Sequence, residues 1–136
     1  TVFGYPQRKA SGFDLNRLQI LAAVLTKRAK VNLTNQDIII NIVGGLKTSD
    51  PAVDLAVCLA ITSSLLNQTI DRKTIVLGEV GLSGEVRNVS RMEQRLKEAE
   101  KLGFTKTIIP NCNIKTVKIK LEKIKNINEI IKKASS

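Results

Sequence analysis

The sequence predicts a single α/β domain in which helices pack against a mixed β-sheet. Segments with helical periodicity and short β-branched segments alternate along the chain, with no internal repeat and no low-complexity linker between them. The 136 residues, of which 43% are apolar, are enough to form one hydrophobic core. We therefore treat residues 1–136 as one domain. Because Met92 is the only methionine, we expect this domain to be a piece of a longer protein.

Two helices are predicted in the first half of the chain. Asp14 is a suitable N-cap for a helix that extends to about Ala29, since apolar residues recur there every three or four positions. Asp50 and Pro51 supply the N-cap and the first residue of a second helix, which extends to about Leu65. The second helix is apolar on nearly all sides, so we expect it to lie in the centre of the domain.

Two more helices are predicted in the second half. Residues 90–93 have the pattern of a capping box, and Gly103 is a suitable glycine for the C-terminal end of the helix that follows. Asn126 with Glu129 three positions later predicts a last helix, which extends to about residue 134.

Five segments have the character of strands. Residues 38–43 are β-branched and almost continuously apolar, as in a strand that is buried on both faces. Residues 74–77 form a second strand, and residues 78–86 contain a turn at residues 81–84 that leads into a third. Residues 107–109 form a short strand, and residues 117–122 alternate between apolar and charged side chains, as in a half-exposed strand.

The sequence contains no histidine. This excludes Ser-His-Asp and Cys-His catalysis and removes a principal zinc ligand. Cys58 lies in an apolar helical segment and is expected in the core, and we expect no disulfide between it and Cys112. No apolar window reaches the roughly 18 residues of a membrane span, so no membrane-spanning segment is expected.

The chain carries 22 basic and 12 acidic residues, which gives a net charge of +10. A field of this sign favours a polyanion such as nucleic acid or an anionic membrane surface, although a solvated lysine-rich surface has the same composition. Because there are only three Phe, one Tyr and no Trp, binding to phosphates is favoured over stacking on bases. Lys118 and Lys120, on the predicted tail strand, are expected to be solvated charges that protect a sheet edge.

Two glycine motifs fail the requirements of nucleotide sites. Residues 44–48 resemble half of a P-loop, but Leu46 and Asn41 occupy two positions that require glycine. The glycines within residues 78–84 are explained better by a hairpin turn than by a dinucleotide-binding loop. We therefore expect no ATP or NAD site in this domain.

Six phrases of the sequence are specific enough to indicate a family: YPQRKASGFD (5–14), NRL (16–18), NQD (35–37), GGL (44–46), DPAVDLA (50–56) and GEVGLSGEVR (78–87). From residue 48 to 110, the order of elements is similar to the second half of a Lon proteolytic domain. The phrases resemble more closely the Lon-protease-like domain found at the C-terminus of the RadA (Sms) family of bacterial DNA-repair proteins. The resemblance covers residues 4–134 and implies a Lon-like fold.

By this resemblance, active Lon enzymes carry a serine nucleophile just after the proline that opens the helix and a lysine base in the following helix. The corresponding residues here are Ala52 and Arg95. Ala52 has no nucleophilic oxygen, and Arg95 cannot deprotonate to act as a base. A family glycine two residues after the serine is Asp54 here, which we expect to place a negative charge near the oxyanion. The resemblance therefore implies a degenerate site with no catalytic residue.

A shifted Ser–Lys pair is the remaining route to peptidase activity. Ser49 with Lys47, or Ser63 and Ser64 with Lys97, supply the residue types. Ser49 precedes the helix, and Ser63 and Ser64 lie deep within it, away from the N–H groups at its N-terminus. We expect neither arrangement to support catalysis.

The resemblance implies that the full-length protein is a DNA-dependent ATPase that promotes branch migration as a hexameric ring. A zinc ribbon and a RecA-like ATPase would lie outside this domain, so ATP, Mg and Zn are expected only there, with no cofactor or metal in this domain. The domain itself is implied to be a hexamerisation scaffold and an auxiliary, sequence-independent surface for single-stranded or branched DNA in the bacterial cytoplasm. The candidate phosphate contacts are Arg8, Lys9, Arg17, Lys47, Arg87 and Arg91.

Two other functions stay open at this point. One is a pure oligomerisation module without DNA contact, whose apolar surface is buried against neighbouring subunits. The other is a residual Ser–Lys peptidase.

Overall fold

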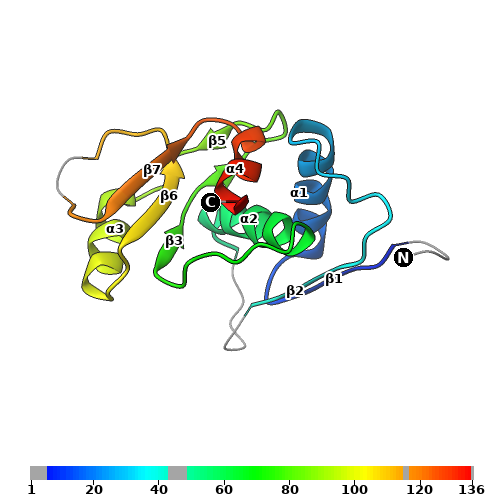
Figure 1. The fold of residues 1–136 in the computed structure, drawn as a ribbon, viewed down its shortest axis with the longest axis horizontal. Helices are drawn as coiled ribbons and strands as arrows, with labels where there is room; N and C mark the ends of the chain where they lie inside the picture. The colour runs from blue at the N-terminus through cyan, green and yellow to red at the C-terminus, as the bar shows by residue number, and fades with distance from the viewer. Residues whose placement is uncertain (1–5, 43–48, 115–116, 136) are drawn as a thin grey trace.

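Helices alternate with short strands along residues 6–42, 49–114 and 117–135, which are the residues that the computed structural model describes (Figure 1). The elements follow in the order β1 (Arg8–Ser11), α1 (Leu15–Arg28), β2 (Ile38–Asn41), the 3-10 helix η2 (Pro51–Val53), α2 (Asp54–Leu65), β3 (Thr74–Val76), β4 (Glu79–Val80), β5 (Val86–Arg87), α3 (Met92–Lys101), β6 (Lys106–Pro110), β7 (Lys120–Ile124), the 3-10 helix η3 (Ile127–Glu129) and α4 (Ile130–Ser135).

The strands form three small sheets in this part of the chain. β1 pairs with β2 in parallel, β6 lies between β3 and β7 in a second parallel sheet, and β4 and β5 form an antiparallel hairpin. The predicted α/β class is confirmed, although these strands are divided among three sheets rather than joined in one mixed sheet. β1 was not predicted, because its four residues carry two basic side chains and no β-branched residue.

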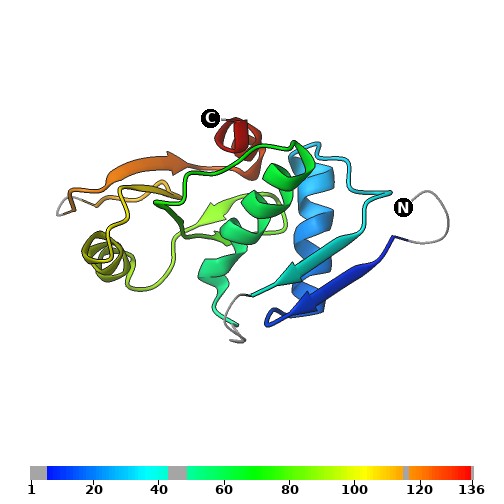
Figure 2. The same cartoon turned by 60° about the horizontal axis from the view of Figure 1, so that its bottom comes forward.

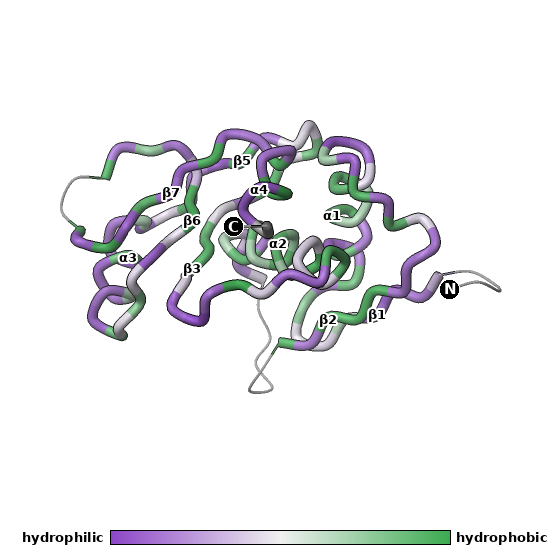
Figure 3. Tube along the Cα trace, viewed as in Figure 1, coloured by the Kyte–Doolittle hydropathy of each residue, from purple (hydrophilic) through white to green (hydrophobic). Residues whose placement is uncertain are grey.

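The two helices of the first half lie side by side and provide most of the main core (Figure 2). The predicted N-cap of α1 is confirmed, since the side chain of Asp14 accepts a hydrogen bond from the N–H of Arg17. The predicted central position of α2 is also confirmed, because most of its residues are buried, Cys58 among them. In Figure 3, where the chain is coloured by hydropathy, α2 is largely hydrophobic, whereas α3 is largely hydrophilic.

The prediction that residues 38–43 form a strand buried on both faces is wrong for the residues that the structure describes there. Ile38 is buried, but the side chain of Ile39 is 68% exposed. The reason is that helices cover only one face of the β1–β2 sheet, so side chains alternate between core and solvent.

The predicted capping box at residues 90–93 is also wrong. The N-cap of α3 is Arg91, which has a left-handed backbone with φ 57° and makes no side-chain cap, and the helix begins at Met92. Ser90 instead offers its carbonyl oxygen to Nε of Arg95, at 2.8 Å. The predicted end of this helix is confirmed, because Gly103 has φ +94° and its N–H bonds back to the carbonyl of Glu100.

The C-terminal segment agrees with the prediction in its cap and differs in its strand. The capping box of Asn126 and Glu129 is present, and it opens the turn of η3 that leads into α4. β7 begins at Lys120 rather than at residue 117, since the N–H of Lys118 bonds to the side chain of Glu100 on α3 instead of to a strand. Lys118 and Lys120 are both exposed, but only Lys120 lies on β7, which is an edge of its sheet, whereas Lys118 precedes the strand.

A second, smaller core cluster lies between α3 and the three-stranded sheet. Met92, Leu96 and Ile109 are its buried members, and the main cluster lies around α1 and α2. In the described residues no helix is both long and apolar enough to cross a membrane.

Candidate functional site

The N-terminus of α2 is the place where the resemblance locates the degenerate catalytic residues. Asp50 accepts a hydrogen bond from the N–H of Ala52 at 3.0 Å, with Pro51 at the first helical position, as predicted for this cap. Ala52 is fully buried, and its carbonyl accepts a hydrogen bond from the N–H of Gly78 at 3.0 Å. Leu55 then donates its N–H to the carbonyl of Gly78 at 3.0 Å. The segment that leads into β4 therefore lies directly against the start of the helix.

Arg95 reaches this same point from α3. Its Nη1 donates to Oδ2 of Asp50 at 2.9 Å, and its Nε donates to the carbonyl of Ser90 at 2.8 Å. The N–H of Ala52 and the guanidinium of Arg95 together lower the pKa of the Asp50 carboxyl. The structure thus brings the positions of Ala52 and Arg95 to one site, where Arg95 binds the cap carboxylate.

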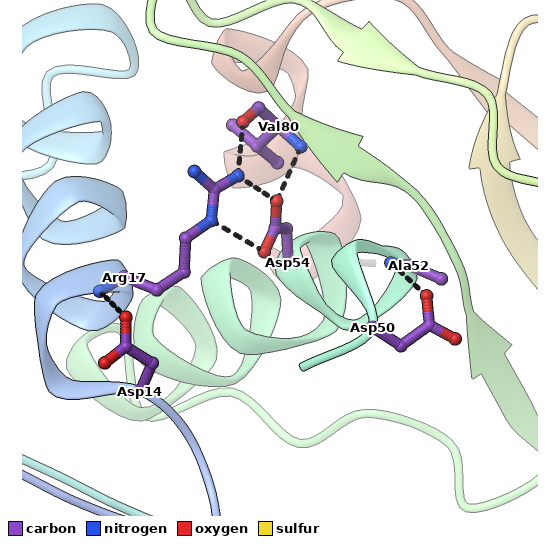
Figure 4. Close-up of polar contacts among 6 residues, drawn as sticks. All are labelled: Asp14, Arg17, Asp50, Ala52, Asp54 and Val80. Atoms are coloured by element: carbon purple, nitrogen blue, oxygen red, sulfur yellow. Dashed lines mark hydrogen bonds and ion pairs between the residues drawn. The ribbon is translucent and has the colours of Figure 1, made fainter. Parts of the chain in front are cut away.

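Asp54 is the first residue of α2, four positions after Asp50, and it is only 1% exposed. Figure 4 shows its polar contacts. Its two carboxylate oxygens accept hydrogen bonds from Nε and Nη2 of Arg17, the first at 3.1 Å, and Oδ2 also accepts from the N–H of Val80 at 3.1 Å. Nη2 of Arg17 donates in addition to the carbonyl of Val80 at 2.9 Å. The carboxylate is therefore balanced by a guanidinium and a backbone N–H, and it is a structural group that joins α1, α2 and β4.

From the sequence, Asp54 was expected to place a negative charge near an oxyanion, and the contacts of its carboxylate show which groups that charge faces. The carboxylate is turned toward Arg17 and Val80, and the hydrogen bond to it raises the pKa of the Arg17 guanidinium. The other face of the predicted site holds the Asp50–Arg95 pair. Each of the two acidic residues at this end of α2 has a basic partner from another helix.

Cys58 and Ser63, two residues whose side chains carry nucleophilic atoms, lie along α2. The Cys58 thiol is fully buried, and burial raises its pKa, so it stays protonated. The hydroxyl of Ser63 donates to the carbonyl of Ala60, and Lys97 forms an ion pair with Glu93. These contacts do not join Ser63 to Lys97, and Lys47 lies outside the described residues.

The candidate phosphate contacts are in different positions. Arg8, on β1, donates to the backbone carbonyls of Gln36 and Leu33, and it ties the loop before β2 to β1. Arg17 forms an ion pair with Asp54, so its guanidinium is engaged in an intramolecular contact. For these two residues the geometry favours a structural role, and DNA contact stays a prediction.

The remaining described candidates are exposed. Lys9 lies on the solvent face of β1, and Arg91 lies at the left-handed N-cap of α3. Arg87, on β5, forms an exposed ion pair with Glu85 at 2.8 Å. Arg17 and Arg87 line one small pocket of about 200 Å³, but Glu79 and Glu85 line it too, so the pocket is not a cationic cradle. Lys9, Arg87 and Arg91 thus belong to three different parts of the fold, β1, β5 and the N-cap of α3.

Sequence reasoning missed the Arg17–Asp54–Val80 contact. Arg17 and Asp54 are 37 positions apart, and the only signal was an aspartate in an otherwise apolar helix. A charge in such a place requires a partner, and Arg17 lies on the adjacent helix, one turn after the N-cap of α1.

Comparison with known proteins assigns the family. A family model described as subunit ChlI of Mg-chelatase matches residues 9–113 of the chain. The chain belongs to the ChlI family. This ChlI-family chain is 50% identical to the DNA repair protein RadA of Bacillus subtilis over 114 residues, which are 84% of the chain and 25% of that relative. It is 42% identical to the DNA repair protein RadA of Streptococcus pneumoniae over 137 residues, which are 98% of the chain and 33% of that relative.

These relatives confirm the resemblance to RadA proteins predicted from the sequence phrases. The ChlI-family chain is also 43% identical to the DNA repair protein RadA of Chlamydia pneumoniae, over 96% of the chain and 30% of that relative. The chain thus spans a quarter to a third of the length of these relatives. Within the described residues of this ChlI-family domain, no group of three or more Cys, Asp or Glu side chains is placed to hold a metal ion.

The ion pair of Arg17 and Asp54 yields a stability prediction. Arg17→Ala leaves the Asp54 carboxylate buried without its main partner, and we expect it to lower the free energy of unfolding by about 3–5 kcal/mol. Asp54→Ala and the double variant complete a thermodynamic cycle by urea denaturation, in which the double variant should be less destabilised than the sum of the two single variants. Lys97→Ala, at the exposed ion pair of Lys97 and Glu93, serves as the control and should change the free energy of unfolding by no more than about 0.5 kcal/mol. Additive single effects would contradict a direct Arg17–Asp54 interaction.

Proposed function

We propose that this chain is a non-proteolytic, Lon-like domain of a RadA-type DNA-repair protein. In that protein it acts as a scaffold for hexamer assembly and as an auxiliary, sequence-independent DNA-binding surface. The observation that carries the proposal is the pairing of both acidic residues at the start of α2 with arginines from other helices, Asp50 with Arg95 and Asp54 with Arg17. A site built from such pairs stabilises the fold and has no group that attacks a peptide bond.

The sequence similarity to RadA proteins supports the DNA-repair part of the proposal. The net charge of +10 supports a contact with the phosphate backbone rather than with bases, given the few aromatic residues. In this proposal the remainder of the longer protein is a DNA-dependent ATPase that acts in branch migration in the bacterial cytoplasm. ATP, Mg and Zn bind in that remainder, and none of them binds in this domain.

A pure assembly module is the second candidate function. It is favoured by three large apolar side chains that are about 70% exposed, namely Ile39 at 68%, Leu102 at 69% and Leu82 at 72%. Exposed apolar side chains of this size are suited to burial between subunits. This candidate shares the scaffold role and lacks the DNA contact.

The absence of peptidase chemistry is tested with a fluorophosphonate that labels activated serines. We expect no labelling of the chain, and none of the Ala52→Ser, Arg95→Lys double variant. In that variant the new lysine would lie beside the Asp50 carboxylate, which stabilises the ammonium form and prevents it from acting as a base. Labelling of the unmodified chain would establish a peptidase, and labelling of the double variant alone would contradict the role given to Asp50.

The DNA and assembly roles are tested together on the 136-residue chain. Fluorescence anisotropy with single-stranded and branched DNA of several sequences should give affinities that vary little with sequence and fall linearly with salt on a log–log plot. Native mass spectrometry should give masses above that of the monomer. An oligomer without salt-dependent DNA binding would favour the pure assembly module, and a flat salt response with a monomeric mass would contradict the proposal.

A further inference from the structure

Three segments that are distant in the sequence meet at one edge of the molecule: the C-terminal end of α1, the turn of the β4–β5 hairpin, and the chain around η3 and α4. In Figure 1 they lie along the upper edge, where the light-blue end of α1, the hairpin turn and the red α4 are neighbours. An added Cβ at Gly84 would be 3.0 Å from Cβ of Arg28 and 3.0 Å from Cγ2 of Ile127. The turn glycine therefore lies between α1 and η3.

Backbone hydrogen bonds hold this junction together. The N–H of Ile127 donates to the carbonyl of Gly84 at 2.7 Å, and the N–H of Val86 donates to the carbonyl of Lys125 at 3.0 Å. Gly84 has φ +85°, so the turn depends on a residue without a side chain at this point. The junction is fixed by main-chain contacts, which leaves the long side chains around it free to extend into solvent.

Positive charges strongly outnumber negative charges at the junction. Residues 27–30, 81–87 and 125–133 contain seven basic and two acidic residues. Both carboxylates are engaged, since Glu85 pairs with Arg87, and Glu129 accepts hydrogen bonds from the N–H groups of Lys125 and Asn126. Burial raises the pKa of the Glu129 carboxyl, but these two N–H groups and the charges of Lys133 and Lys125 together lower it overall, so the carboxylate stays ionised.

In the part of the chain that the structure describes, five cations at this junction form no ion pair of 4.0 Å or less, although the charge of one of them, Lys125, acts on the Glu129 carboxylate. All five are exposed. We call them the α1–α4 basic face: Lys27, Arg28, Lys30, Lys125 and Lys132. None of them was a candidate from the sequence, because the two groups come from opposite halves of the chain.

We propose that the α1–α4 basic face is the surface of this domain that binds the phosphate backbone of nucleic acid. This inference rests on the proposed function and deepens it, because it assigns the DNA contact to residues other than the candidates from the sequence. The segments that form the face contain no aromatic residue, so phosphates are the groups that it recognises and sequence is not read. The unpaired cations give it a local positive field that the mixed-charge pocket of Arg17 and Arg87 lacks.

The test compares two sets of three exposed lysines with the same loss of charge. The face variant carries Lys27→Gln, Lys125→Gln and Lys132→Gln. The control variant carries Lys73→Gln, Lys101→Gln and Lys118→Gln, all near the far end of α3, where Asp71 and Glu100 lie nearby. Both sets are surface substitutions, and circular dichroism and thermal denaturation check that both variants fold as the unmodified chain does.

Binding is measured by anisotropy with a fluorescein-labelled 30-base-pair duplex and its single strand, over a range of salt concentrations. Loss of three phosphate contacts should reduce the slope of log affinity against log salt for the duplex by about 2.7, and reduce the affinity about 100-fold near 0.15 M salt. The control variant should keep the slope of the unmodified chain and lose no more than a few-fold in affinity.

The outcomes separate this inference from the proposed function. If the unmodified chain binds no DNA even at low salt, the proposed function and the inference both fail. If it binds DNA and the face variant is unchanged, or if both variants lose affinity equally, the α1–α4 basic face is not the contact surface, while the proposed function stands. Phosphatidylserine vesicles that bind the unmodified chain more tightly than DNA and displace it would overturn nucleic acid as the ligand in favour of an anionic membrane.

Discussion

The contact of Arg17, Asp54 and the backbone of Val80 is the interaction on which the arrangement of the domain depends. It joins α1, α2 and the β4–β5 hairpin at a point where the carboxylate is almost fully removed from solvent. A buried carboxylate without partners is strongly destabilising, so the three elements are held in one geometry. Gly78, just before this hairpin, donates its N–H to the carbonyl of Ala52. The turn of the hairpin extends to the junction of α1 and η3.

The ion pair of Asp50 and Arg95 also joins the start of α2 to another helix. Asp50 caps the helix through the N–H of Ala52 and binds Arg95 from α3. The start of α2 is therefore joined to α3 by this pair and to α1 by the pair of Asp54 and Arg17. The two positions that the resemblance assigns to a nucleophile and a base are thus close together and hold structural residues. This arrangement is the one that the proposed non-proteolytic role requires. The unpaired cations, in contrast, lie away from this site, at the edge formed by α1 and α4.

Local patterns predicted the helices well and the long-range contacts poorly. The caps at Asp14, Asp50 and Asn126 depend on a few neighbouring residues, so they could be predicted from the sequence alone. The capping box at residues 90–93 failed because Arg91 adopts a left-handed conformation that its sequence does not signal. The Arg17–Asp54 pair and the basic face depend on which helices meet in space, and a single sequence carries little information about that.

The most direct test of the account is native-state hydrogen exchange of the Val80 amide, which donates to the buried Asp54 carboxylate. If this contact organises the domain, the Val80 amide should exchange only through global unfolding, with the same opening free energy as the Leu55 amide on α2. The Ser83 amide, which bonds to the exposed Glu85 carboxylate, should exchange much faster and serves as the reference for local opening. A Val80 amide that exchanges as fast as Ser83 while Leu55 stays protected would contradict the central place given to the Arg17–Asp54–Val80 contact.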